Sequence, residues 1–389
     1  MKRAIVNATL WTVSQGVIEN GVLLIEQGKI AAIGSNEDLK VPEGFEIIDA
    51  KGHIVTPGFI DAHSHVGLAE EGVGWAGDDL NEATDPNTAQ VRPVDGINPM
   101  DLGFADCLDG GVTTAQIAPG DSNVLAGIMQ VIKTTGTIAD SMVIKHLSGV
   151  KAVLGESAKS TYGSQRKMPG TRMGSAAVLR AALSDAAIYL EKKEKASSPD
   201  KMPAIDLRKE SLCAVLKREV PLSVHAVRAD DIATAIRIAK EFKLDLIIEN
   251  CSDGHLLAEE IANAKARVCL GPTIAAKSKV EFKNLGYETH LALESVGVSF
   301  TMVSGHPNLP ASYLNLNVAL AIREGLSEQV ALESVTINAA RFLGLEDRIG
   351  SLEIGKDADI VIWDDEPFEL TTSTIMTIID GEIVKGGKA

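Results

Sequence analysis

The chain has 389 residues, of which 45% are hydrophobic, 23% charged and only 4% aromatic. This length is too great for one small core and suits a large barrel with an accessory domain. The formal net charge of −16 argues against nucleic acid or an anionic membrane as a partner, because both attract basic faces. No signal-peptide h-region and no long apolar run is present, so we expect a cytoplasmic protein that does not cross a membrane. The four cysteines form no C-x-x-C pair, which predicts reduced, buried thiols.

Both ends of the chain have the pattern of short β-hairpins. Asn20-Gly21 and Asp380-Gly381 are hairpin-turn signals that lie between apolar runs. Because isolated hairpins need a partner sheet, we predict that residues 1–55 and 350–389 form one discontinuous β-sandwich domain.

The middle of the chain alternates between strand-like and helix-like runs, which predicts a parallel sheet in an α/β fold. Candidate ligands fall at several strand ends, so residues 56–349 are predicted to form a (β/α)8 TIM-type barrel rather than an open sheet. Two stretches without periodicity, residues 66–103 and 157–171, are predicted to be functional loops. The strand-like runs are 221–227, 244–248, 267–270 and 296–303, and the helical runs are 230–242, 255–264 and 327–343.

Residues 55–65, with the sequence VTPGFIDAHSH, place two histidines at the end of a short apolar strand. Residues two apart in a strand face the same side, so His63 and His65 are predicted to bind one ion. Imidazole suits Zn, Fe, Ni or Mn. The alternative is a pair of surface histidines, or one histidine in the core and a second that lies two residues away by chance.

This segment resembles the amidohydrolase superfamily, and within it the imidazolonepropionase- and prolidase-like branch. The resemblance extends over nearly the whole chain and includes residues 110–114 (GGVTT), 154–156 (LGE), 224–226 (VHA), 336–340 (TINAA) and 349–359 (IGSLEIGKDAD). It implies a (β/α)8 barrel, a small β-sandwich from both termini, and one or two divalent ions that activate water. The reaction that it implies is hydrolysis of an amide, or of a related C–N or ester bond.

Four positions match the family's ligands. His63 and His65 match the first-strand pair, and His225 matches the histidine of the fifth strand. Glu156 lies where this branch carries a glutamate that bridges two ions or binds one. The alternative for His225 is a core histidine, and for Glu156 a carboxylate in a loop.

Two positions depart from the pattern. The sixth strand should end in Glu-His, but Asn250 stands in place of the histidine. The eighth should end in Asp-His-Pro, but Gly305 replaces the aspartate, which in the family moves the proton of the attacking water. Loss of such a group costs ~10²–10⁴-fold in rate. His306 is the nearest substitute base, with His255 and Asp253 as others; the alternative is that His306 only caps a turn.

Basic side chains near the second loop are candidates for substrate binding. Arg166, Arg172 and Arg228 can receive a carboxylate through a bidentate guanidinium. The alternative is a solvated surface that balances local acids.

These observations predict a metal-dependent hydrolase that cleaves an amide or other C–N bond of a small polar substrate: a cyclic amide, an N-acyl amino acid or a dipeptide. We expect one divalent ion rather than two, with Zn favoured over Fe, Mn or Ni, and a homo-oligomer. A non-catalytic barrel that serves as a binding or assembly module is the first alternative, and a related lyase or isomerase is the second. About one tightly held ion per chain is expected for the hydrolase.

Overall fold

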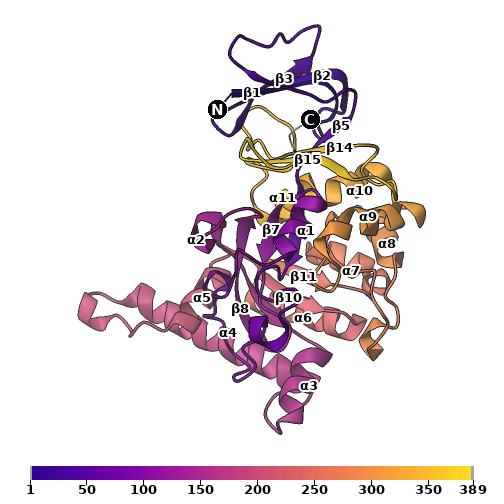
Figure 1. Ribbon diagram of the computed structural model, residues 1–389. Coiled ribbons are helices and arrows are strands. Elements are labelled where there is room, and N and C mark those ends of the chain that lie inside the picture. Colours follow the sequence, from indigo (N-terminus) through magenta and orange to yellow (C-terminus); the bar gives the residue numbers. More distant parts are fainter. Residues whose placement is uncertain (1, 387–389) are drawn as a thin grey trace.

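The computed structural model describes residues 2–386 and contains two eight-stranded sheets. One sheet curls into a nearly closed barrel surrounded by helices, and the other is built from both ends of the chain and covers one end of the barrel (Figure 1). The predicted α/β fold with a TIM-type barrel is confirmed. Within the described residues, no helix has the length and apolar composition needed to cross a bilayer.

The barrel strands follow one another in sequence order around the sheet. Backbone hydrogen bonds from Gly305 N to His63 O (3.2 Å) and from His65 N to His306 O (3.0 Å) bring the last strand against the first. The strands are β6 (Phe59–Ser64), β7 (Val112–Ile117), β8 (Leu125–Lys133), β9 (Val143–Val153), β10 (Leu222–Ala226), β11 (Leu246–Asn250), β12 (Arg267–Leu270) and β13 (Phe300–Met302).

Strand β8 departs from the predicted all-parallel arrangement. It pairs antiparallel with both β7 and β9, whereas the other neighbouring pairs in the barrel are parallel. A parallel connection needs a crossover of about a dozen residues or more, and residues 118–124 are too few for one. The short connection therefore returns the chain in the opposite direction.

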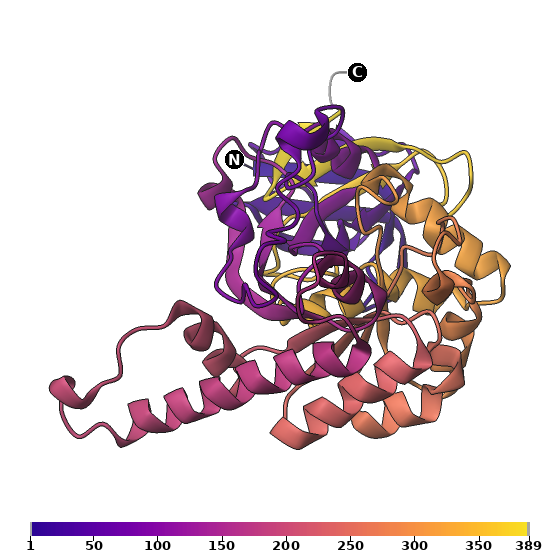
Figure 2. The same cartoon turned by 90° about the horizontal axis from the view of Figure 1, so that it is seen from below.

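Helices cover the outside of the barrel, and one pair extends beyond it. The long helix α4 begins at a cap in which the Thr171 side chain accepts a hydrogen bond from Gly174 N, and with α5 it projects away from the barrel (Figure 2). The helices are α1 (Gly103–Asp109), α2 (Ala139–Met142), α3 (Glu156–Ser164), α4 (Arg172–Lys195), α5 (Leu207–Leu216), α6 (Ala229–Phe242), α7 (Ala258–Ala264), α8 (Glu288–Ser295), α9 (Leu314–Arg323), α10 (Glu328–Ser334) and α11 (Ile337–Leu343). Short 3-10 turns are Gly74–Gly77, Pro93–Asp95, Pro199–Lys201, Gly254–Leu256, Val280–Phe282 and Ala311–Tyr313.

Three local predictions were wrong. The single helix expected over 327–343 is two helices, because the chain breaks at the β-branched Thr336, whose hydroxyl donates to Leu332 O. Residues 157–171 are not all loop, since α3 occupies their first part. Asn20-Gly21 is no turn: both residues lie inside strand β2, where the pairing register shifts.

The terminal sheet joins the two ends of the chain. Strand β14 pairs antiparallel with β5, so the sheet has a core of its own that includes Ile5, Leu23, Val55, Ile360 and Ile378. Asp380-Gly381 makes the predicted turn between β15 and β16. The strands are β1 (Lys2–Trp11), β2 (Val17–Glu26), β3 (Lys29–Ser35), β4 (Glu46–Asp49), β5 (Ile54–Pro57), β14 (Ile360–Trp363), β15 (Thr374–Ile379) and β16 (Glu382–Lys385).

A buried lysine fastens the terminal sheet to the barrel. Lys133, at the end of β8, places its Nζ 2.9 Å from Asp357 Oδ2 and also donates to Asp359. Burial alone would lower the pKa of Lys133, but Asp359, Asp380 and Asp357 raise it above its ordinary value. The acidic residues of the 349–359 segment therefore dock one domain onto the other.

Candidate functional site

The ends of the barrel strands open on a polar cavity of about 620 Å³. Parallel barrels place their functional groups at this face, because the strand ends and the loops after them converge there. The cavity is lined by His63, His65, Asn81, Asp121, Ser157, Ser160, Thr161, His225, Glu249, Asn250, Lys279, Gly305, Pro307 and Asn308, among others. The three predicted histidine ligands therefore share this cavity, although in the described part of the chain they do not form a group whose ligand atoms all lie within 4.8 Å of one another.

His65 is held as a neutral imidazole with one ring nitrogen available. Its Nδ1 lies 2.7 Å from Ala118 O, and because a carbonyl only accepts, Nδ1 carries the proton. Nε2 therefore keeps its lone pair. Burial, with the charges of Lys151 and His63, lowers the pKa of His65 to about 3. A histidine whose other ring nitrogen donates to a carbonyl is the usual arrangement of a metal ligand.

His63 and His225 each stand beside a carboxylate. His63 Nδ1 lies 3.3 Å from Glu249 Oε1, and His225 Nδ1 lies 3.6 Å from Asp121 Oδ1. The rings of His63 and His65 are 5.0 Å apart and nearly perpendicular. Strand β6 places His63 and strand β10 places His225, so the group assembles across the barrel mouth.

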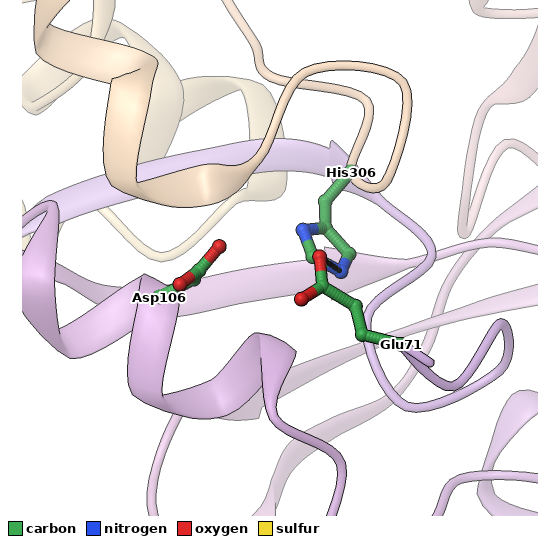
Figure 3. A group of neighbouring side chains, drawn as sticks. All are labelled: Glu71, Asp106 and His306. Carbon is green, nitrogen blue, oxygen red and sulfur yellow. Dashed lines mark ion pairs between the residues drawn. The ribbon is translucent and has the colours of Figure 1, made fainter. Parts of the chain in front are cut away.

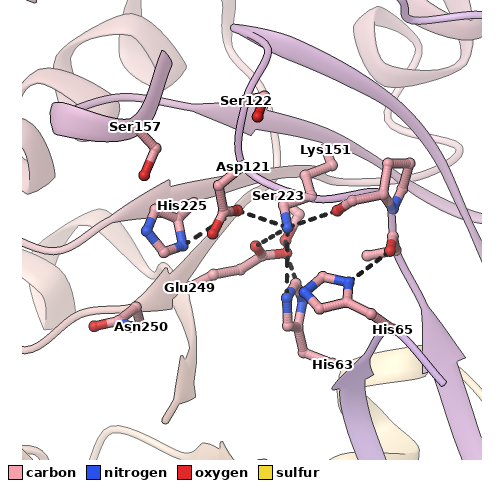
Figure 4. A network of polar contacts seen from close by, with 12 residues as sticks. His63, His65, Asp121, Ser122, Lys151, Ser157, Ser223, His225, Glu249 and Asn250 are labelled. Carbon is pink, nitrogen blue, oxygen red and sulfur yellow. Dashed lines mark hydrogen bonds and ion pairs between the residues drawn. The ribbon is translucent and has the colours of Figure 1, made fainter. Parts of the chain in front are cut away.

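A fully buried lysine stands in the middle of this group (Figure 4). Lys151 Nζ, from β9, lies 2.8 Å from Asp121 Oδ1, 2.8 Å from Pro119 O and 3.5 Å from His63 Nε2. Glu249 Oε2 lies 3.8 Å away. The ammonium therefore balances one of the two carboxylates.

Both carboxylates are ionised, although Glu249 is buried and Asp121 is only about a third exposed. Burial alone would raise the pKa of Glu249, but the charges of His63 and Lys151 and a 2.6 Å hydrogen bond from Ser223 lower it to about 2. For Asp121, His225 and Lys151 outweigh burial in the same way and lower its pKa below the ordinary value. Asp121, Glu249 and Lys151 together carry one net negative charge, which suits a cation.

The sequence analysis missed Asp121 and Lys151 and noted Glu249 only in passing. Lys151 had a signal: it is a lone charge within the apolar run 149–153. Glu249 also had one, since it ends an apolar strand. Asp121 had none, because its place depends on the short β7–β8 connection.

Glu156 and His306 lie outside the cavity lining. Glu156 begins α3, where its backbone N–H donates to Glu281 Oε2, and its side chain is half-buried. The His306 ring is fully buried and turned toward Glu71. Of the other substitute bases, the His255 ring contacts Thr289 Oγ1, and Asp253 accepts from Ala229 N.

The three predicted arginines do not line the cavity either. Arg172 donates to both oxygens of Asp231 at 3.0 Å, and Arg228 makes a two-pronged pair with Asp230. Arg166 is exposed. Lys279 does line the cavity, and its Nζ lies 3.2 Å from Ser157 Oγ.

The two departed positions both line the cavity. Asn250 Oδ1 accepts from Ser252 Oγ at 2.6 Å. Gly305 has a φ of +57°, and a Cβ there would lie 2.8 Å from Pro272 Cδ. The turn after β13 therefore has room for glycine but not for a larger residue without movement of Pro272.

The comparison with known families agrees with this geometry. Residues 54–384 match the amidohydrolase family. The chain belongs to this family. An amidohydrolase from Thermotoga maritima MSB8 has a structure with a TM-score of 0.95 and 39% identity, over 99% of this chain and 100% of that one.

Two curated relatives extend the comparison. The amidohydrolase tasK of Hapsidospora irregularis is 30% identical over 93% of this chain, but the chain spans only 39% of that protein's length. The imidazolonepropionase of Brucella anthropi is 28% identical, over 91% of this chain and 90% of its own.

Proposed function

We propose that the chain is a metal-dependent hydrolase that cleaves an amide or other C–N bond in a small polar substrate. Cyclic amides, N-acyl amino acids and dipeptides are the substrate classes we favour. The observation that carries this proposal is the group His63, His65 and His225 on one polar cavity, with His65 oriented through Ala118 O. The likeness to imidazolonepropionase supports a cyclic C–N substrate.

The donor types suit one divalent ion, which would have to draw the three imidazoles closer together. His63, His65 and His225 would hold it, with Asp121 and Glu249 close by, and nitrogen-rich sites favour zinc, with iron, manganese and nickel as alternatives. When bound, such an ion supplies Lewis acidity, which polarises a carbonyl and makes water a stronger nucleophile near neutral pH. One ion is favoured over two because the positive charge of Lys151 balances one of the two negative charges of Asp121 and Glu249.

Asp121 takes the proton-accepting role that the missing eighth-strand aspartate leaves open. It lines the cavity, and about a third of its side chain is exposed. Lys279 offers a positive charge for a substrate carboxylate because it lines the cavity and its contact with Glu281 is long, at 3.9 Å, whereas Arg172 and Arg228 lie outside the lining. A volume of about 620 Å³ suits a small molecule.

A non-catalytic binding or assembly module is the second candidate. The position of Lys151 favours it, because an ammonium in the centre of the group stabilises Asp121 without any bound ion. Asn250 and Gly305 favour the non-catalytic module as well, because they stand where the family carries a histidine and an aspartate.

Metal content and hydrolysis together test the proposal. Elemental analysis compares the purified wild type with a His63→Asn/His225→Asn variant. A His146→Asn protein, which replaces an exposed histidine, is the control. The double variant should lose about one ion per chain relative to the control. The same proteins are assayed on a panel of cyclic amides, N-acyl amino acids and dipeptides, where only wild type and control should release product. An ion that binds without turnover of any panel member would favour the module.

A further inference from the structure

A second group of metal-binding side chains lies outside the cavity. Glu71 from the 66–103 segment, Asp106 from α1 and His306 from the turn after β13 point toward one another (Figure 3). One ligand atom from each lies within 4.8 Å of the other two, and His306 Nε2 lies 3.7 Å from Glu71 Oε1.

The His306 ring is fully buried, and its Nε2 has no hydrogen-bond partner in residues 2–386. A buried ring nitrogen without a partner is costly, by about 1–3 kcal/mol in general, so it indicates a ligand. Gly103 packs directly against the ring, and a Cβ there would lie only 2.6 Å from Nε2. The unpartnered nitrogen has the Glu71 carboxylate as its nearest acidic neighbour.

The charge around His306 Nε2 is negative. Neither Glu71 nor Asp106 pairs with a lysine or arginine in the described part of the chain. Two carboxylates therefore share one small region without such a side chain to balance either of them.

We propose that His306, Glu71 and Asp106 bind a divalent cation of the zinc class. One imidazole nitrogen and two carboxylate oxygens suit zinc, cobalt or manganese, with water completing the coordination. Glu71 is about a third exposed and can rotate to bring its oxygen within the ~2.1 Å that coordination needs. A hollow of about 430 Å³, lined by Glu71 and Pro307, lies on the solvent side of Glu71.

Binding requires one small rearrangement. Ala311 N now donates to His306 Nδ1 across a long 3.4 Å, which places the ring proton on Nε2. Coordination through Nε2 moves that proton to Nδ1 and ends this weak contact.

The ion would join three segments that are distant in sequence. The long 66–103 segment and helix α1 would be fastened to the turn that carries Gly305 and Pro307, both of which line the cavity. This second centre is therefore structural: it holds one wall of the cavity in place.

Zinc titration in a protein without the first centre tests the proposal. In the His63→Asn/His225→Asn background, zinc chloride alone should bind at about one ion per chain, measured by competition with a chromogenic chelator. Adding Asp106→Asn should abolish this binding. Adding Asp109→Asn, which removes a more exposed acid from the same helix, should leave it unchanged.

Gly103→Ala tests the site with every ligand retained. Its Cβ should push the His306 ring away and weaken zinc binding about tenfold or more. This variant and Asp106→Asn carry the test if His306→Gln does not fold, as judged by circular dichroism. Equal zinc binding by the Asp106→Asn and Asp109→Asn proteins would overturn the proposal, as would a zinc-edge anomalous map of wild-type crystals with no peak beside His306.

Discussion

Lys151 Nζ lies 2.8 Å from Asp121 Oδ1 at the centre of the barrel mouth, and the lysine is fully buried. The pair joins strand β9 to the β7–β8 connection. Removing one partner of a buried pair leaves the other charge uncompensated, which costs more than the pair itself contributes. The ion pair is therefore a condition for the local fold as well as a neighbour of the candidate metal ligands.

Lys151→Met should lower the free energy of unfolding by ~3–5 kcal/mol in the presence of a chelator, because Asp121 and Glu249 lose their positive partner. Urea denaturation measures the change. Lys151→Met/Asp121→Asn should recover part of the loss, since the unpaired charge is also removed. A Lys151→Met protein within about 1 kcal/mol of wild type would contradict the prediction.

Lys133→Met should weaken the contact between the terminal sheet and the barrel and so lower the free energy of unfolding. It leaves Asp359 buried without its cation, whereas Asp357 keeps Lys29 and Arg348, so we expect a loss of about 3 kcal/mol and earlier unfolding of the terminal sheet. Lys195→Met is the matched control, because its pair with Glu191 is exposed and such pairs contribute ~0–1 kcal/mol. Equal effects of the two substitutions in urea denaturation would count against a docking role for Lys133.

His290 should make stability depend on pH. Burial lowers the pKa of its ring to about 3, and neither ring nitrogen has a hydrogen-bond partner among the described residues. Below the unfolded value of about 6.5, only the unfolded chain takes up the proton, so stability falls as the pH falls, by at most about 1.4 kcal/mol per pH unit.

The pH effect is measured as a difference between proteins. His290→Phe should flatten the pH dependence of the free energy of unfolding between pH 6.5 and pH 4 relative to wild type. His146→Phe replaces an exposed histidine and should leave the slope unchanged. Parallel curves for wild type and His290→Phe would show that the ring is protonated in the folded state as well.

Gly305→Asp should destabilise the protein rather than repair the site. The positive φ costs roughly 1–2 kcal/mol for most residues, and less for Asp, while contact of the new Cβ with Pro272 adds ~1–3 kcal/mol. Gly16→Asp separates the two contributions, because Gly16 also has a positive φ but has open space around it. Thermal unfolding should therefore show a larger loss for Gly305→Asp, and equal losses would mean that Pro272 moves aside freely.

The barrel and the shared cavity position of His63 and His65 were readable from the sequence because both depend on local patterns. Alternation along an apolar strand that ends in His63-x-His65 turns both side chains to the same face, whereas His225 was assigned through the family resemblance. The direction of β8 was not recognised, although the brevity of residues 118–124 was a local signal for it.

The remaining errors involve contacts between segments that are distant in sequence. Lys151 contacts Asp121 and Glu249 only in the folded barrel. The periodicity of the sequence does not predict such contacts between distant segments. Arg172 was predicted to bind substrate, but its guanidinium donates hydrogen bonds to Asp231. The Arg228–Asp230 pair is an exception, because its partners are two residues apart and were visible in the sequence.

The antiparallel course of β8 divides its two flanking connections between opposite ends of the barrel. Residues 118–124 hold Asp121 against Lys151, so lengthening them would misplace a carboxylate. Residues 135–137 lie at the far end, where Gly136 and Thr137 are exposed. An epitope tag or a small folded module inserted there would leave the cavity mouth undisturbed, which makes this tip a natural place to attach a label.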